Sequence, residues 1–488
     1  MTELRLADMA CPLDARYYGA DPAFFARLRP YVSEDAFIRC QLQVELALAE
    51  ILTEYGVAPT HFADEVARAG GSIEVRHVYE EEERIGHVVR ALVNCIRERI
   101  DEPLRPFVHL FATSNDITDT ATALRLKALT RDVLLPDLQV LQDALIRLAR
   151  LHAHTVQIGR THGKYAEPIT FGYFLANYVA RIGNRIDAIE AARRNLRGKF
   201  SGAVGAYNAL RLKFRDAPAI ESALLRKLGL EAVDAHVSTQ VVHPEYVTDL
   251  VHALVSTFSV LANLADDVRH LHRSEIDETQ EIYDEARVGS STMPHKLNPK
   301  NFEFVKSMWK EFMPRMMTVY MDQITEHQRD LTNSASSRFV TEFMTAFAYS
   351  VVRLTSAVKN LGVQERSMRR NFDEASAETL AEPLYILLSL QGHPDGHGHA
   401  RRLMRKSRET GAPLMDLIRA EESLRPYLER LTPDQRRALE HAENYTGLSA
   451  ERTEIVCDQF EVAGRQLLDR LDAERREQER PRQKLQGA

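Results

Sequence analysis

The chain has 488 residues and a formal net charge of −7, with 44% hydrophobic and 27% charged residues. This length is too great for one ordinary core and predicts two or three globular domains. The negative charge, without a dominant basic patch, excludes a protein that works mainly by binding a nucleic-acid backbone.

Apolar residues recur at helical spacing along the chain, whereas alternating strand patterns are scarce. Pro314 is expected to kink the fourth of these stripes, and Gly362 closes the fifth. Because several long helices in succession pack side by side, we expect an all-α fold with a long central helical bundle. The five stripes predict helices around residues 138–148, 175–189, 250–271, 302–312 and 339–358.

This distribution predicts three helical domains. A shorter N-terminal domain spans residues 1–112, and the central bundle domain spans 113–364. A C-terminal domain spans 365–488 and ends in a charged tail that we expect to be frayed. The N-terminus lacks the pattern of a signal peptide, and no apolar run reaches the length of a membrane span. The four cysteines lack zinc-site spacing, so we expect free thiols, a cytoplasmic location and no membrane partner.

Polar segments that interrupt a bundle at helix ends are places where chemistry can occur. In the segment 288–303, Lys296 and Asn298 flank a single leucine, and together their side chains could hold a carboxylate. A serine there could act as a base if backbone N–H groups and the lysine favour its ionised form. From the residues alone, a long polar connection explains this segment equally well. The segments are 111–120, 159–172, 199–210, 288–303 and 327–338.

The segment GSSTMPHKLNP (289–299) resembles the signature GSSxMPxKxNP of the fumarase/aspartase/argininosuccinate lyase superfamily at every fixed position. Six further segments are similar to those of the adenylosuccinate lyase family and follow in the same order. They are PLDARY (12–17), TSNDITDTA (113–121), GRTHGKYAEPITFG (159–172), SGAVGAYNA (201–209), STQ (238–240) and QRDLTNSASSR (328–338). The resemblance implies a homotetramer with a shared bundle core and active sites assembled from three subunits. It also implies a small succinyl substrate, no cofactor and no metal.

The resemblance also implies a mechanism, in which a group is eliminated from a succinyl carbon and fumarate is released. Ser290 would remove the proton, while Lys296 and Asn298 would hold the carboxylate that takes up the charge. His162 would protonate the leaving group, with Glu303 as its carboxylate partner. The implied substrate-binding residues are Arg16, Tyr17, His87, Thr113, Ser114, Lys164, Gln240, Ser291, Arg329, Ser334 and Arg338.

The chain departs from the adenylosuccinate lyase pattern near this expected site. Val88 stands where that family has an Asp after its His, and Gly86 stands where an Arg is usual. Lys164 stands where that family usually has Gln or Val, and Arg287 stands where a Glu is common. Because an isopropyl group cannot accept the hydrogen bonds of a carboxylate, the substrate stays open. We rank adenylosuccinate first, and second nitrosuccinate, which relatives split to fumarate and nitrous acid, or another succinyl adduct.

Two other classes of function remain as alternatives. Relatives of this superfamily serve as structural lens proteins, so the chain could be a non-catalytic scaffold, although a scaffold does not need the reactive residues together. The segment HPDGHGH (393–399) brings three histidines close in sequence and could bind a metal. The expected reaction uses none.

Overall fold

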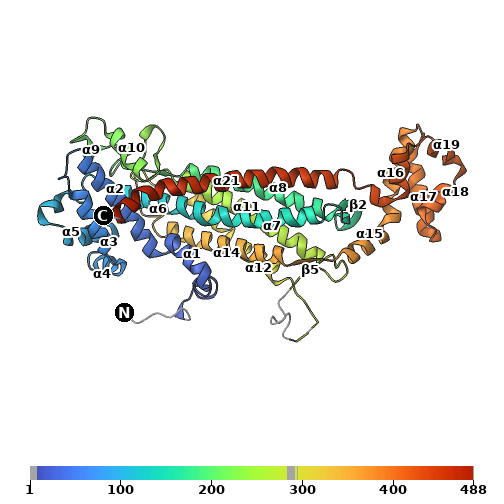
Figure 1. Ribbon diagram of the computed structural model, residues 1–488, viewed down its shortest axis with the longest axis horizontal. Helices are drawn as coiled ribbons and strands as arrows, with labels where there is room; N and C mark the ends of the chain where they lie inside the picture. Colours follow the sequence, from blue (N-terminus) through green and yellow to red (C-terminus); the bar gives the residue numbers. More distant parts are fainter. Residues whose placement is uncertain (1–7, 283–291, 294, 487–488) are drawn as a thin grey trace.

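The computed structural model describes residues 8–282, 292–293 and 295–486 as an elongated, mostly helical molecule (Figure 1). A long bundle forms its middle, with a group of N-terminal helices at one end and a group of C-terminal helices at the other. The all-α prediction is confirmed. Within the described residues the strands are short and form two-stranded sheets: β1 (Val156–Thr161) with β2 (Lys164–Thr170), β3 (Arg197–Gly198) with β4 (Glu231–Ala232), and β5 (Thr279–Glu281) with β6 (Leu361–Val363).

The N-terminal helices pack around α2, whose apolar face is buried. The Ser33 hydroxyl accepts the Ala36 N–H at 3.1 Å and so begins α2 with a side-chain cap. Gly86 ends α4 in the left-handed region at φ 73°, a conformation that favours glycine. The helices are α1 (Pro22–Val32), α2 (Glu34–Glu54), α3 (Phe62–Ser72), α4 (Val75–Ile85) and α5 (Val88–Glu98).

The bundle contains all five predicted helices. Pro314 breaks the fourth stripe into two helices, α12 and α13, because proline lacks the N–H that an α-helix needs. Its main helices are α6 (Ser114–Leu129), α7 (Leu135–Leu151), α8 (Phe171–Arg194), α11 (Glu245–Leu271), α12 (Lys300–Phe312), α13 (Arg315–Met321) and α14 (Val340–Lys359). Two short helices, α9 (Asn208–Arg211) and α10 (Ala217–Lys227), lie beside the N-terminal end (Figure 1).

One helix axis runs along most of the bundle. The helix α6, a π-helical segment η4 (Thr130–Leu134) and α7 follow one another without a gap in the chain. At 1.5 Å per residue, this run of helix is about 55 Å long. It therefore holds the residues before α6 and those after α7 at opposite ends of the bundle.

The helix α11 is long and apolar enough to cross a membrane by length and composition, although the sequence analysis found no run of that kind. In the structure 67% of its apolar window is buried. It packs against α8, α12 and α14. We therefore interpret α11 as the core helix of the bundle.

The last helix, α21 (Ser449–Gln486), returns along α7 and α8. Arg193 of α8, only 1% exposed, binds Glu190 and, at 2.7 Å, Glu474 of α21. The chain after residue 448 therefore joins the main core. The charged tail, which the sequence predicted to be frayed, continues α21 to Gln486.

The C-terminal end of the molecule has a small core of its own, separate from the bundle. Phe372, Leu384, Leu403 and Ile418 are among its buried residues. The hairpin of β1 and β2 packs against α15 and so lies between this group and the bundle. The helices are α15 (Glu365–Thr379), α16 (Ala381–Leu390), α17 (Gly396–Thr410), α18 (Leu414–Ala420), α19 (Arg425–Leu428) and α20 (Pro433–Glu440).

Replacement of Gly183 by alanine is expected to destabilise the protein. A Cβ atom at this position of α8 would overlap the Phe460 ring of α21, and overpacking of this kind costs about 1–3 kcal/mol. Urea unfolding would measure the loss. Gly71→Ala in α3 is the matched control, since a Cβ there meets nothing within 4 Å. Equal stability of the two variants would contradict tight packing of α21 on α8.

Candidate active site

The beginning of α6 brings three predicted site residues together. The ring of His87 caps α5, with its Nδ1 accepting the Arg90 N–H at 3.3 Å. A neutral ring with an accepting Nδ1 carries its proton on Nε2. That Nε2 lies 3.4 Å from the Ser114 hydroxyl. Thr113 is the N-cap of α6, so a carboxylate placed here would also meet the free N–H groups of a helix N-terminus.

A buried ion pair supports this helix end. Asp116 and Lys199 have fully buried side chains, and the Lys199 ammonium donates to the Asp116 carboxylate. Asp116 also accepts the N–H groups of Thr113 at 2.9 Å, Ser201 at 3.1 Å and Gly202 at 3.2 Å. The 199–202 segment is thus fixed against the first turn of α6. Lys199 also neutralises a carboxylate that would otherwise weaken the attraction of this helix end for anions.

A second acid, the half-buried Asp119, joins two more of the predicted segments to the same place. Asp119 accepts the Val242 N–H at 2.9 Å, two residues after Gln240. Burial raises the pKa of Asp119, against the lowering effects of this N–H and of the positive charge of Arg329. The Gln240 N–H donates to the Gln328 carbonyl at 3.3 Å. Gln240 and Arg329 therefore lie on the α6 side of the molecule.

The segment 328–338 resembles the phosphate-binding segment of the adenylosuccinate lyase family and is the predicted phosphate segment. Its other predicted binding residues are exposed. Ser334 sits in a turn, where its N–H bonds the Leu331 carbonyl at 3.1 Å. Arg338 is close enough to the α4 residue Tyr79 to affect its pKa: burial and a hydrogen bond to Glu34 raise that pKa, and the charge of Arg338 lowers it. The segment 328–338 therefore runs near the N-terminal helices.

The structure gives Gly86 and Val88 structural roles. Gly86 supplies the left-handed residue between α4 and α5. Val88 is half-buried against a small apolar cluster that includes Val44 and Ile117. An apolar contact therefore occupies the position where the sequence pattern placed an aspartate.

The signature segment is described only in part, because Ser290 and Ser291 lie outside the described residues. Lys296 is exposed and Asn298 is half-buried. The Leu297 carbonyl accepts a hydrogen bond from His272 Nε2 at 3.0 Å, which ties the segment to the end of α11. The segment leads into α12, where Glu303 lies in the first turn with an exposed side chain.

Tyr17 and Arg16 lie beside α12 rather than at the α6 end. The Tyr17 ring packs at 5.3 Å from Phe304 and 5.4 Å from Tyr349, while Arg16 is exposed. The aromatic Phe304, which follows Glu303, thus helps to hold the N-terminal segment against the bundle.

His162 and Lys164 lie at the tip of the β1–β2 hairpin. His162 and Gly163 both have positive φ, 53° and 72°, and they join paired residues Thr161 and Lys164. This is the geometry of a two-residue type I′ turn. The side chains of His162 and Lys164 are exposed, and within the described residues no ion pair joins His162 to Glu303.

Charged residues anchor the base of this hairpin. Arg160 and Gln157 donate to the buried Glu278 at 2.6 Å and 2.7 Å.

At the start of α12, after the signature segment, the buried Glu281 accepts the Asn301 N–H at 3.1 Å. The sequence analysis did not single out Glu278, Glu281 or Asn301. The sequence shows these three only as charged or amide residues beside a motif. That position does not tell whether such a side chain is buried or exposed.

The long helix keeps the two groups of residues apart. Ser114 lies at the first residue of α6, and His162 follows the end of α7 by eleven residues in a hairpin that packs on α15. The α6–α7 run of about 55 Å lies between them. A single chain therefore does not bring Ser114 and His162 to one substrate.

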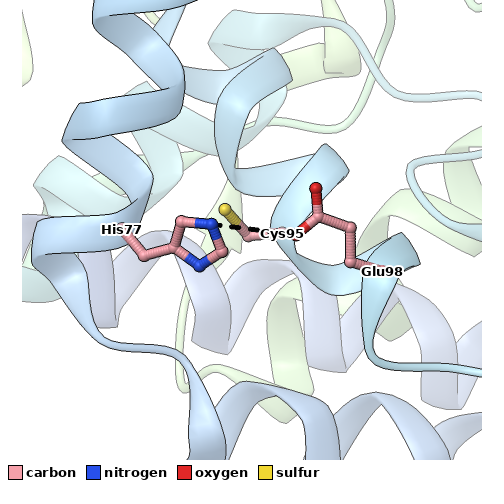
Figure 2. A group of neighbouring side chains, drawn as sticks. All are labelled: His77, Cys95 and Glu98. Carbon is pink, nitrogen blue, oxygen red and sulfur yellow. Dashed lines mark ion pairs between the residues drawn. The ribbon is translucent and has the colours of Figure 1, made fainter.

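One group of described residues has ligand atoms close enough for a metal ion. His77 of α4 and Cys95 and Glu98 of α5 place these atoms within 4.8 Å of one another (Figure 2). The Arg99 guanidinium donates to His77 Nδ1 at 2.8 Å and lies 3.6 Å from the Glu98 carboxylate. Because an accepting Nδ1 leaves the proton on Nε2, and Arg99 already supplies the positive charge, an ion-pair cluster explains the group better than a metal.

The histidines of the 393–399 segment have structural contacts. His393 Nδ1 accepts the Asp395 N–H at 3.0 Å, and its ring packs on Tyr427. The His397 ring packs on Tyr385. These contacts stabilise the start of α17.

Comparison with known proteins places the chain in a family. A lyase family model matches residues 21–313, and a model of the adenylosuccinate lyase C-terminal region matches 325–436. Adenylosuccinate lyase from Bacillus subtilis is 31% identical over 81% of this chain and 89% of its own length. The enzyme of the same name from Pyrococcus abyssi is 31% identical over 92% of this chain and 98% of its own.

Solved structures agree on the fold. A fumarate lyase from Mesorhizobium has a TM-score of 0.77 at 22% identity, covering 89% of this chain and 97% of its own. A 3-carboxy-cis,cis-muconate lactonizing enzyme from Pseudomonas putida also has a TM-score of 0.77, at 23% identity, and the match covers 90% of this chain and 97% of that enzyme. With two matching family models and full-length relatives at this identity, the chain belongs to the lyase family that contains adenylosuccinate lyase.

Proposed function

We propose that the chain is a carbon–nitrogen lyase that cleaves adenylosuccinate to fumarate and AMP. The observation that best supports this is the α6 end, where Ser114 lies 3.4 Å from His87 and Arg329 lies near Asp119. A helix N-terminus with a hydroxyl beside it suits a succinyl carboxylate, and an arginine suits a phosphate. The names of the relatives favour the same substrate.

The residues implied by the resemblance can carry out both proton transfers of the proposed reaction. Ionised Ser290 takes the proton from the carbon next to a carboxylate, and Lys296 and Asn298 hold that carboxylate while it carries the added charge. The C–N bond then breaks and the C=C bond of fumarate forms. His162 donates a proton to the departing nitrogen, with Glu303 from another subunit as its partner.

The separation of Ser114 from His162 supports a shared site. We propose a homotetramer in which each site takes the α6 end of one subunit and the hairpin tip of another. Assembly in this way would also bring an acidic partner to His162, which is exposed in the single chain. The expected location is the cytoplasm, as for a biosynthetic enzyme of small metabolites.

Two features of the chain favour nitrosuccinate as a second candidate substrate. Val88 packs into an apolar cluster and leaves no carboxylate beside His87, while Lys164 adds a positive charge at the hairpin tip. Nitrosuccinate, which has no nucleotide to bind, fits a site altered in this way. Nitrite is a good leaving group and needs little help from an acid, so the retained His162 and Glu303 favour adenylosuccinate over nitrosuccinate.

The experiment that decides between these substrates measures fumarate by its ultraviolet absorbance. The purified chain is incubated separately with adenylosuccinate, argininosuccinate and nitrosuccinate, and adenylosuccinate is expected to react fastest. His162→Ala should lower kcat for an amine leaving group by about 100-fold or more, and much less for nitrite. His154→Ala, which removes an exposed histidine before the hairpin, is the control. No fumarate from any of the three would overturn the proposal.

A further inference from the structure

A cavity at the C-terminal end of the molecule lies outside the proposed reaction site. It has a volume of about 800 Å³ and lies between β2 and the helices α15, α16 and α17. None of the residues proposed to act on the succinyl substrate lines it. The cavity belongs to the C-terminal group, which has its own small core.

One wall of the cavity is basic. His397, Arg401, Arg405 and Arg408 line it from α17. Their spacing of four, four and three residues places them on one face of this helix. A row of guanidinium groups on one face is suited to carboxylate or phosphate oxygens, which each group can bind with two N–H donors.

The other walls offer rings and small apolar groups. Tyr165 of β2 and Tyr385 of α16 both line the cavity, together with Ala166, Ala381 and Met404. The Tyr385 ring is already fixed edge-on against His397, with centroids 5.5 Å apart. Tyrosine rings and alanines form a surface against which a planar ring can pack.

The ion pairs leave one arginine of this wall available. Arg405 binds Glu409 at 2.7 Å, and Arg408 binds Glu378 at 2.9 Å. Arg401 makes no ion pair with any described residue. Among the acids of the cavity, Glu382 is hydrogen-bonded to the carboxyl of Glu167, which raises the pKa of Glu382. Arg401 is therefore the guanidinium of this wall that is placed to bind an anion.

We propose that this cavity binds a small organic anion with a planar ring, such as an aromatic carboxylate or phosphate. Its anionic group binds Arg401, and its ring packs on Tyr165 and Tyr385. The site is distinct from the reaction site, and the inference does not rest on the proposed function. Because Tyr165 lies three residues after His162, the cavity also adjoins the strand that carries the hairpin tip.

Phenyl phosphate is the probe that tests this proposal, by isothermal titration of the full-length protein. We expect one saturable site per chain with affinity lowered about tenfold or more in Arg401→Gln. Arg402→Gln is the matched control, since Arg402 follows on the same helix, does not line the cavity and binds Asp395 at 3.5 Å. Affinity in that variant should stay unchanged.

Four results would contradict the proposal, and the last concerns inorganic phosphate. The first is the absence of saturable binding, and the second is an equal loss in the Arg401 and Arg402 variants, which would indicate general attraction to α17. The third is loss of binding in Arg338→Gln with none in Arg401→Gln, which would place phenyl phosphate at the predicted phosphate segment. Inorganic phosphate is expected to bind more weakly than phenyl phosphate, and equal affinity would contradict the role of the rings.

Discussion

Two inactive variants, Ser114→Asp and His162→Ala, should regain activity when they are mixed and allowed to reassemble. Aspartate in the first turn of α6 suits the helix but places a negative charge where the succinyl carboxylate would bind. His162→Ala removes the proposed acid. Since the α6–α7 helix holds the two positions at opposite ends of the bundle, each site of the proposed tetramer would draw them from different subunits.

The size of the recovery follows from random assembly. A site is competent only if its α6 end comes from the His162→Ala chain and its hairpin from the Ser114→Asp chain, so about one quarter of sites are intact in an equal mixture. Fumarate release before and after reassembly measures this. Thr113→Asp mixed with Ser114→Asp is the control, because both changes lie at the same helix end and no site can be repaired. Failure of the first mixture to recover would contradict shared sites.

Lys199→Met is expected to cause the largest loss of stability among single changes near the site. The side chains of Lys199 and Asp116 are both fully buried, and removal of one partner leaves an uncompensated charge, which costs about 3–5 kcal/mol. Urea unfolding would measure the loss. The remaining negative charge also lies at the helix end proposed to bind a carboxylate, so KM should rise more than kcat falls.

A double variant separates charge from packing. In Asp116→Asn with Lys199→Met the carboxylate is gone, while the single amide oxygen can still accept the N–H groups of Ser201 and Gly202, which bond the same oxygen of Asp116. Most of the lost stability should return. If the double variant is as unstable as Lys199→Met, the loss comes from the packing of the lysine stem and the electrostatic account of this helix end is wrong.

The helices could be predicted because their apolar residues repeat at a fixed spacing. The stripe at 250–271 became α11 and the stripe at 339–358 became α14. Pro314 was readable as a helix break because the effect of proline is local. The return of α21 along the bundle was not predicted: its contacts with α8 join residues far apart in sequence, such as Arg193 and Glu474.

The site was predictable only as a set of motifs. His87, Thr113 and Ser114 stood in recognisable patterns, and the structure brings them together. Lys199 and Glu278 were not singled out, because a charged side chain becomes structural only when its partner is known. Those partners lie 83 residues away at Asp116 and 118 residues away at Arg160. In the proposed tetramer, where the hairpin tip meets the substrate would depend on contacts between chains.

The π-helical segment η4, within the helix that separates Ser114 from His162, limits how the length of this chain can change. Each residue of an α-helix turns the chain by about 100° and advances it by about 1.5 Å. An insertion or deletion between α6 and α7 would therefore rotate the α6 end, with Ser114 and His87, relative to α7 and the hairpin that follows it, and a π-turn already accommodates one added residue. Differences in length among relatives are expected in the surface connections of the C-terminal group, as around Gly411, rather than in this helix.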